Sequence, residues 1–342
     1  MGPNLLMLCA FRLWRARERG HRYRIAVVTD DPVRYTERTC RSVLEPWSEW
    51  ASVDSYWPLR EGVPVDPKDQ SANACLALVQ NAKALRIIRE YCERIGLLLI
   101  EPNLPDEGGL EYDLYREVNY FDYELGGTND WDGKPTSHPV PTLQRLSAAQ
   151  CQQFYPTWGL EGMPRRAEPW RVIDVGCGPI SVLRWGALAG EMTLTGVDPL
   201  LEMYALVLAR HGYLSLPKIR CALEIPAFAE QLDTLVPDAA FDLIYTQNAL
   251  DHTQDPQKVV SHFARKLVPG GRVIIQVATC EGTRQGWDQF HKTDIDIHDG
   301  QLVFCHQHTK NRPLLAPEFG LRLCNVQLYG PEWLSVVLER GS

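Results

Sequence analysis

The chain has 342 residues, a formal net charge of −8, and a composition that is 45% hydrophobic and 23% charged. This is average globular usage, and it excludes a disordered, collagenous or coiled-coil chain. The acidic balance provides no overall positive field that would attract nucleic acid or an anionic membrane.

Cysteine spacing and the N-terminal sequence bear on the cellular compartment. The ten cysteines include no CxxC or CxxxC pair, so we expect reduced thiols and no structural zinc. No apolar run approaches the ~20 residues that a membrane span needs. The basic residues of segment 1–24 follow its short apolar run, the reverse of a secretory signal, and the segment lacks the serine enrichment of a transit peptide. These features predict a cytoplasmic protein whose first helix has a solvated basic face.

The first part of the chain predicts a small α/β unit. Residues 24–30 and 97–101 are short apolar runs typical of buried strands. Between them, residues 72–94 carry the apolar spacing of an amphipathic helix.

Prolines and glycines then interrupt residues 102–169. A structureless loop of that length is rare in a compact domain, so we expect helices over 110–123 and 143–154. Together, residues 1–165 are expected to form an N-terminal α/β extension or cap without an assigned role.

From Trp170 onward, strand and helix signals alternate, which predicts a doubly wound parallel sheet in a domain of residues 166–342. The final two apolar runs are joined by a link too short for a parallel crossover, so the sheet should end in an antiparallel hairpin. An insertion at 279–312, between the fifth strand and the last helix, would lie at the carboxyl edge as a substrate lid. The expected strands are 171–175, 193–197, 219–221, 241–245, 272–277, 321–329 and 333–338, and the expected helices are 181–189, 200–211 and 256–267.

The first of these strands runs into a glycine-rich turn around Gly176 and Gly178, followed by a helix. Such a turn lets backbone N–H groups approach a charged metabolite, and both dinucleotides and S-adenosylmethionine use it. A dinucleotide fingerprint needs glycine where Ser181 stands, and Asp174 suits an ammonium group better than a pyrophosphate. Asp198, roughly 20 residues beyond the first glycine, lies where a carboxylate meets ribose hydroxyls in both classes.

Four segments together resemble the class I S-adenosylmethionine-dependent methyltransferases. They are VIDVGCGP at 172–179, TGVDP at 195–199, FDLIYTQNALDH at 241–252 and LVPGGRVIIQV at 267–277. The resemblance implies a seven-stranded Rossmann-like sheet and S-adenosyl-L-methionine as cofactor. One departure is Ile180, which stands where the family has a third glycine and places a bulkier side chain at the edge of the turn.

The resemblance also implies the roles of individual residues. The glycine turn would hold the methionine part, Asp198 would bridge the ribose hydroxyls, and the segment after strand three would flank the adenine. The residues that close strand four would lie beside the methyl group. The implied cofactor-binding residues are Asp174, Gly176, Cys177, Gly178, Asp198, Pro199, Leu223, Glu224, Gln247 and Asn248.

Methyl transfer mainly requires alignment, but an alcohol acceptor must also lose its proton to a nearby base. His252, just past strand four, and His291, in the insertion, are the candidate bases, and Asp251 is a candidate to orient the base or bind substrate. Each has a structural alternative: packing or helix capping for His252, a solvated loop for His291, and a helix cap for Asp251.

We expect no metal site. Three aspartates of the insertion alternate with apolar residues, as in a half-exposed strand, and a cysteine and two histidines further on point to opposite faces of one strand. These residues are Asp294, Asp296, Asp299, Cys305, His306 and His308.

The NALDH ending of strand four and residues 290–300 resemble, more narrowly, bacterial methyltransferases of cell-surface polysaccharide and natural-product genes. The predicted function is therefore O-methylation of a small molecule or saccharide, assisted by a histidine base. The alternative is a sensor or scaffold that binds S-adenosylmethionine without turnover, which the unusual N-terminal half and the missing third glycine allow. Nucleic acid is not an expected partner, and the oligomeric state is not indicated.

Overall fold

The computed structural model places the chain in two compact units, Met1–Ser137 with Glu202–Ser215, and His138–Leu201 with Leu216–Ser342. Each unit is described by itself. The structure describes residues 5–17, 21–29, 37–49, 51–58, 72, 74–78, 86, 88–90, 92–93, 98–100, 110–126, 167–211, 213, 221–287, 291–306, 312–313, 319–329 and 332–341.

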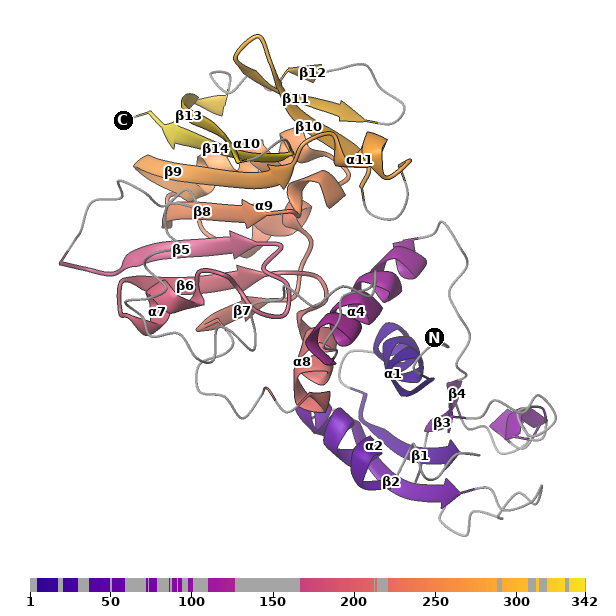
Figure 1. The fold of residues 1–342 in the computed structure, drawn as a ribbon. Helices are drawn as coiled ribbons and strands as arrows, with labels where there is room; N and C mark the ends of the chain where they lie inside the picture. Colours follow the sequence, from indigo (N-terminus) through magenta and orange to yellow (C-terminus); the bar gives the residue numbers. More distant parts are fainter. Residues whose placement is uncertain are drawn as a thin grey trace. The chain divides into compact units, whose positions relative to one another are not determined.

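The first unit contains a four-stranded sheet of order β2-β1-β3-β4, in which every pair of neighbours is parallel (Figure 1). Its buried residues include Ile25, Val27, Val53, Ala74 and Leu78, as expected for a parallel sheet whose faces are covered. Its elements are α1 (Leu5–Ala16), β1 (Tyr23–Thr29), α2 (Glu37–Leu44), η1 (Glu45–Trp47), β2 (Ala51–Pro58), β3 (Ala74–Leu78), β4 (Leu98–Ile100) and α4 (Leu110–Gly126).

Four sequence predictions concern the described residues of this unit. The strands expected at 24–30 and 97–101 are β1 and β4, and the helix expected at 110–123 is α4. The helix expected over 72–94 is wrong at its start, because the run ACLAL forms β3. Its apolar spacing fits a strand as well as a helix, and pairing with β1 on one side and β4 on the other decides between them. The helix expected at 143–154 lies outside the described residues.

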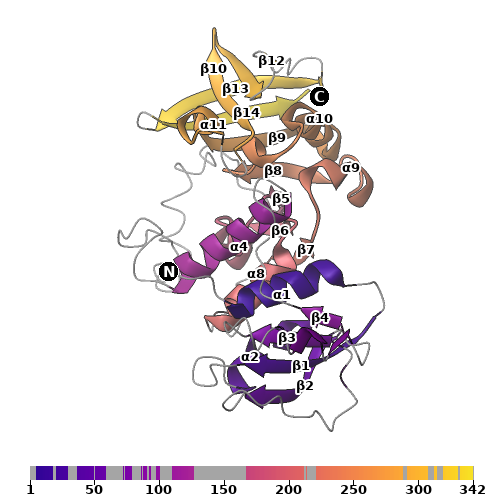
Figure 2. The ribbon, with the colours of Figure 1, turned by 90° about the vertical axis from the view of Figure 1, so that its right-hand side faces the viewer.

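Helix α8 (Leu201–Arg210) follows a strand of the second unit in the chain, but its side chains pack within the first unit. The Trp14 indole N–H donates a hydrogen bond of 2.7 Å to Glu202 Oε2. The rings of Phe121 and Tyr204 meet edge to face, with centroids 5.2 Å apart. Figures 1 and 2 both show α8 beside α1 and α4. Residues from two distant parts of the sequence thus complete one core.

The second unit is built on a seven-stranded sheet of order β13-β14-β9-β8-β5-β6-β7. The five strands from β5 to β9 are parallel, whereas β14 runs antiparallel to both β9 and β13. The predicted Rossmann-like sheet with a C-terminal antiparallel hairpin is confirmed. The strands are β5 (Trp170–Val175), β6 (Met192–Val197), β7 (Leu223–Ile225), β8 (Phe241–Gln247), β9 (Leu267–Ala278), β13 (Leu321–Tyr329) and β14 (Trp333–Arg340).

The strand order reverses between β5 and β8, which makes the carboxyl ends of these two strands the expected ligand crevice of an open α/β sheet. The helices of the second unit are α7 (Arg184–Leu188), η3 (Ala229–Gln231), α9 (Leu232–Leu235), η4 (Leu250–His252), α10 (Pro256–Lys266) and α11 (Glu281–Arg284).

Two predicted elements of this unit are corrected. The third strand is Leu223–Ile225, because pairing with Thr195–Val197 of β6 sets its position. Cys221 of the predicted strand 219–221 precedes it, and residues 219 and 220 lie outside the described residues. The first helix spans only Arg184–Leu188 and not 181–189, because Ser181 bonds back to Asp174 before the helix begins.

The insertion after β9 forms α11 and an antiparallel three-stranded sheet of β10 (Thr293–His298), β11 (Gln301–His306) and β12 (Arg312–Pro313). Ile295, Leu302 and Phe304 are buried in the same hydrophobic cluster as the central strands. The insertion is therefore anchored on the domain core. The last helix, which the sequence predicted after residue 312, lies outside the described residues, since only 319 and 320 are described between β12 and β13.

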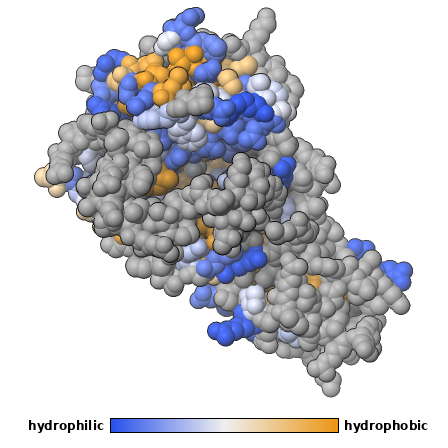
Figure 3. All heavy atoms as spheres, viewed as in Figure 1, coloured by the Kyte–Doolittle hydropathy of each residue, from blue (hydrophilic) through white to orange (hydrophobic). Residues whose placement is uncertain are grey.

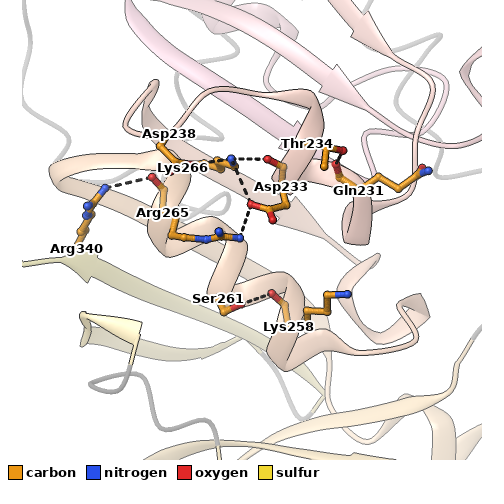
Figure 4. A network of polar contacts seen from close by, with 9 residues as sticks. All are labelled: Gln231, Asp233, Thr234, Asp238, Lys258, Ser261, Arg265, Lys266 and Arg340. Atoms are coloured by element: carbon orange, nitrogen blue, oxygen red, sulfur yellow. Dashed lines mark hydrogen bonds and ion pairs between the residues drawn. The ribbon is translucent and has the colours of Figure 1, made fainter.

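The C-terminal end of α10 is held by charged groups (Figure 4). The Lys266 side chain is 3% exposed, and its ammonium donates hydrogen bonds to Asp238 Oδ1 at 2.7 Å and to the Asp233 carbonyl at 3.0 Å. Arg265 forms an ion pair with Asp233. The buried charge of Lys266 is thus compensated.

Apolar residues gather at the top of the space-filling view, in the region of the C-terminal hairpin and the inserted sheet (Figure 3). Leu328 of the edge strand β13 is 60% exposed. Among the described residues, no helix is long and apolar enough to cross a membrane.

Candidate active site

The turn after β5 approaches β6 closely. The backbone N–H groups of Gly176 and Cys177 donate to the Val197 carbonyl at 2.7 and 3.3 Å. Gly176 has φ +73° and Gly178 has φ +60°, in the left-handed region that favours glycine. A Cβ added to Gly176 would lie 2.1 Å from the Cβ of Ala249, which follows β8. The turn is thus pressed against the end of β8.

We expect Gly176→Ala to be much more damaging than Gly190→Ala. Both positions have a positive φ, so both variants lose about 1–2 kcal/mol of folding stability to backbone strain. Nothing lies within 4 Å of a Cβ at Gly190, whereas Ala249 must move for Gly176→Ala, which adds about 1–3 kcal/mol. Urea denaturation of both variants measures the difference. Equal losses would mean that the close approach of the turn to Ala249 is not present in solution.

Two carboxylates lie buried at this turn. Asp198 Oδ2 accepts a hydrogen bond from Gly178 N at 3.2 Å, and Oδ1 accepts one from Leu200 N at 2.9 Å. Ser181 Oγ donates to Asp174 Oδ2 at 2.5 Å. The glycine-rich turn therefore brings together two acidic side chains from neighbouring strands.

Burial disfavours the charge on both carboxylates. It raises the pKa of Asp174 to about 7, against the hydrogen bond from Ser181, and the Asp198 carboxylate raises it further. Burial also raises the pKa of Asp198 to about 6, against the N–H groups of Leu200 and Gly178. Such groups are satisfied by a ligand that brings a positive charge and hydroxyl donors.

Asp174→Asn should therefore raise the melting temperature of the ligand-free protein, and the gain should be larger at pH 8 than at pH 5. The Asp174 carboxyl has a pKa near 3.9 in the unfolded chain and about 7 in the folded chain. The folded protein is therefore destabilised as the pH rises toward 7, because it must bury a carboxylate that the unfolded chain exposes to water. Asparagine carries no charge at either pH and avoids this loss. Thermal unfolding at the two pH values measures the gain.

Asp238→Asn is the matched control for this prediction. The Lys266 ammonium holds the pKa of Asp238 below its usual value, so its stabilising contribution is already complete at pH 5 and does not change up to pH 8. A gain from Asp174→Asn that is equal at both pH values would contradict the buried-carboxylate interpretation.

The three predicted catalytic residues come together at the same edge of the sheet. Asp251 is fully buried in η4, and its Oδ2 lies 2.7 Å from His291 Nδ1 and 3.4 Å from His252 Nε2. An ionised carboxylate only accepts, so the N–H of His291 Nδ1 donates this hydrogen bond. The two imidazole rings meet edge to face, 4.7 Å apart.

The structural alternatives for two of these residues are wrong. Asp251 does not cap α10, because Asp255 does so by accepting a hydrogen bond from Lys258 N. His291 is not solvated, since it is only 8% exposed. Burial raises the pKa of Asp251, but the charges of His252 and His291 and the hydrogen bond from His291 outweigh it, and the net pKa lies below the usual value.

Glu281 is a fourth member of the cluster that the sequence did not indicate. It is 9% exposed, and its Oε2 lies 3.8 Å from His291 Nδ1. Burial raises the pKa of Glu281, and the charge of Asp251 adds to this effect while His291 opposes it. The one signal in the sequence is its position three residues after β9, at the edge where His252 also lies.

A metal ion has one candidate place among the described residues, where ligand atoms of Asp251, His252 and His291 lie within 4.8 Å of one another. The distance of 2.7 Å between Asp251 and His291 is that of a hydrogen bond. Asp294 does not join an acidic site, because it is buried and accepts hydrogen bonds from the N–H and hydroxyl of Thr283.

The remaining predicted cofactor residues lie at the ends of the neighbouring strands. Asn248 follows β8 with φ +48°, and its N–H donates to the Gln276 carbonyl at 2.7 Å. Its Oδ1 has no hydrogen-bond partner among the described residues. Gln247 closes β8 as predicted, but Leu223 and Glu224 belong to β7 itself and not to the loop after it. Leu223 is 57% exposed.

Comparisons with known proteins show what part of the second unit is similar to. Residues 173–275 match a family model described as a methyltransferase domain. This region of the chain is thus a methyltransferase domain, which supports the resemblance to the class I S-adenosylmethionine-dependent methyltransferases and their cofactor.

Several curated methyltransferases are similar to the chain. Phosphoethanolamine N-methyltransferase 1 of Arabidopsis thaliana is 31% identical over 160 residues, which cover 44% of this chain and 31% of that protein. The 27-O-demethylrifamycin SV methyltransferase of Amycolatopsis mediterranei is 31% identical over 176 residues, 50% of this chain and 58% of that protein. The tRNA U34 carboxymethyltransferase of Pseudomonas fluorescens is 30% identical over 116 residues, 34% of this chain and 35% of that protein. The chain thus spans less than two thirds of the length of each of these relatives.

Proposed function

We propose that the chain transfers a methyl group from S-adenosylmethionine to a hydroxyl oxygen of a small molecule or saccharide. The observation that carries the proposal is the placement of two polar sites at one sheet edge. The buried carboxylates and the glycine turn follow β5 and β6, and the Asp251–His291 pair follows β8 and β9. A sheet of this order binds its ligands at this edge.

The residues at the turn fit the cofactor. S-adenosylmethionine carries an ammonium group for Asp174 and ribose hydroxyls for Asp198. Both carboxylates are buried, and the hydrogen bonds that they accept come from neutral groups, Ser181 Oγ for Asp174 and the N–H groups of Gly178 and Leu200 for Asp198. Gly176, Cys177 and Gly178 would leave room for the methionine part, while Pro199, Leu223 and Glu224 would border the adenosine. When bound, the cofactor supplies the methyl group as a sulfonium.

The histidines would remove the proton of the acceptor hydroxyl. Asp251 holds Nδ1 of His291, so the other ring nitrogen of His291 is the one that accepts a proton, and the buried carboxylate stabilises the imidazolium that forms. His252 contacts the same carboxylate oxygen and is the second candidate for this role. Gln247 and Asn248 would lie between this pair and the cofactor.

Calorimetric titration with S-adenosylmethionine, S-adenosylhomocysteine and NAD tests the proposal. We expect both adenosyl ligands to bind and NAD not to bind. Binding of NAD alone, or of none of the three, would refute it. Binding of the adenosyl ligands without methyl transfer to any acceptor would instead favour the sensor or scaffold role.

The proposed acceptor is a small molecule and not a nucleic acid. The acidic charge argues against nucleic acid, although one similar protein is a tRNA-modifying enzyme. A cytoplasmic location stays a prediction from the sequence.

A further inference from the structure

Of the two carboxylate oxygens of the buried Glu281 side chain, Oε1 accepts a hydrogen bond and Oε2 accepts none from the described residues. Gln285 Nε2 donates a hydrogen bond of 3.0 Å to Oε1. Oε2 has no hydrogen-bond partner among the described residues, although it lies 3.8 Å from His291 Nδ1. The carboxyl group of a side chain that is 9% exposed is costly to leave unsatisfied.

The backbone around Glu281 is held in place. Thr283 N and Thr283 Oγ1 donate to the buried Asp294 carboxylate at 2.9 and 2.5 Å, which ties α11 to β10. A Cβ on Gly282 would lie 2.7 Å from the Trp287 ring, so the indole packs directly on the start of the helix. These contacts fix the backbone that carries Glu281, whose Oε2 lies 3.8 Å from His291 Nδ1.

Among the described residues, no side chain or backbone N–H donates a hydrogen bond to Glu281 Oε2. Arg284 is the nearby cation on the same helix, and it forms an ion pair with Glu332. Nδ1 of His291 is taken by Asp251 at 2.7 Å. Asp251 Oδ1 likewise has no hydrogen-bond partner among the described residues. Two carboxylate oxygens of the cluster, Glu281 Oε2 and Asp251 Oδ1, are thus without a hydrogen-bond donor among the described residues.

We propose that Glu281 is an acceptor-binding residue whose free Oε2 receives a hydrogen bond from the methyl acceptor, beside the group that His291 deprotonates. This inference rests on the proposed function. It requires an acceptor with two neighbouring donor groups that is neutral or positively charged, such as a vicinal diol or a vicinal amino alcohol. An acceptor with a carboxylate or phosphate beside the reacting hydroxyl would meet two buried carboxylates and be repelled.

Three ring compounds of the same shape and different charge test this proposal: trans-2-aminocyclohexanol, trans-1,2-cyclohexanediol and trans-2-hydroxycyclohexanecarboxylate. Each is titrated by calorimetry into the protein saturated with S-adenosylhomocysteine. A hydrogen bond to a charged group is worth about 1.5–3 kcal/mol, so we expect the amino alcohol to bind at least about tenfold more tightly than the hydroxycarboxylate. The diol should fall between them.

Glu281→Gln should reduce the affinity for the amino alcohol about tenfold or more, with unchanged affinity for S-adenosylhomocysteine. The matched control is Glu332→Gln, at the exposed glutamate that forms an ion pair with Arg284. This variant should change neither the affinity for the amino alcohol nor that for S-adenosylhomocysteine.

The inference is overturned if the hydroxycarboxylate binds as well as the amino alcohol, if none of the three binds, or if Glu281→Gln has no effect. It is also overturned if Zn²⁺ or Mn²⁺ binds tightly in a manner that Glu281→Gln abolishes, since a metal would then occupy these oxygens. If the unmodified protein does not bind S-adenosylhomocysteine, the proposed function itself is refuted.

Discussion

Asp198→Ala is expected to weaken the binding of S-adenosylhomocysteine by about a hundredfold or more. Each hydrogen bond from a ribose hydroxyl to the carboxylate is worth about 1.5–3 kcal/mol, and two are lost together. The substitution also removes the acceptor for the N–H groups of Gly178 and Leu200, which loosens the turn itself. Calorimetric titration of the variant and the unmodified protein measures the effect.

Asp255→Ala is the control for this experiment. Asp255 caps α10 through Lys258 N, so its loss costs stability without touching the cofactor turn. Its affinity for S-adenosylhomocysteine should be that of the unmodified protein. A Kd of Asp198→Ala within about threefold of that of the unmodified protein would be too small a change for even one lost hydrogen bond. That result would show that Asp198 does not bind the ribose.

His291→Ala should reduce the rate of methyl transfer by about 10²–10⁴-fold, the usual contribution of a general base. The affinity for S-adenosylhomocysteine should stay the same, because the Asp251–His291 pair is assigned to the acceptor. Asp251→Asn should also reduce the rate, since an amide cannot stabilise an imidazolium as the carboxylate does. Single-turnover transfer from radiolabelled S-adenosylmethionine separates the chemical step from binding.

His298→Ala is the matched histidine substitution. Its side chain is 57% exposed and contacts Asp296, at the far end of β10 from His291. It should leave the rate unchanged. Full activity of His291→Ala would exclude His291 as the base and leave His252, which contacts the same carboxylate.

The sequence predicted the sheet of the second unit well because its signals are local. The strands near Val175 and Val197 are apolar runs followed directly by a turn with glycine or proline. The antiparallel hairpin of β13 and β14 is predicted because the segment that joins these two strands is too short for a parallel crossover. β3 was missed because Ala74–Leu78 has a spacing that suits either a strand or a helix, and only pairing with β1 and β4 decides.

The candidate site was predictable where one motif carries it. Asp251 and His252 are neighbours in the sequence, and Gly176 and Gly178 share one turn. Glu281 could not be found this way, because its contact with His291 depends on how α11 is tied to β10 through Asp294 and Thr283. Glutamate ten residues before a histidine has no pattern of its own.

The assignment of α8 to the first unit has a consequence for biosynthesis. The apolar face that includes Met203, Leu206 and Val207 is buried, and the unit it completes begins near the N-terminus. A ribosome adds about 5–20 residues per second, so the helix emerges on the order of ten seconds after the rest of that unit. During this time the nascent chain exposes part of a core, and the first unit cannot finish folding until the segment carrying Asp198 has been made.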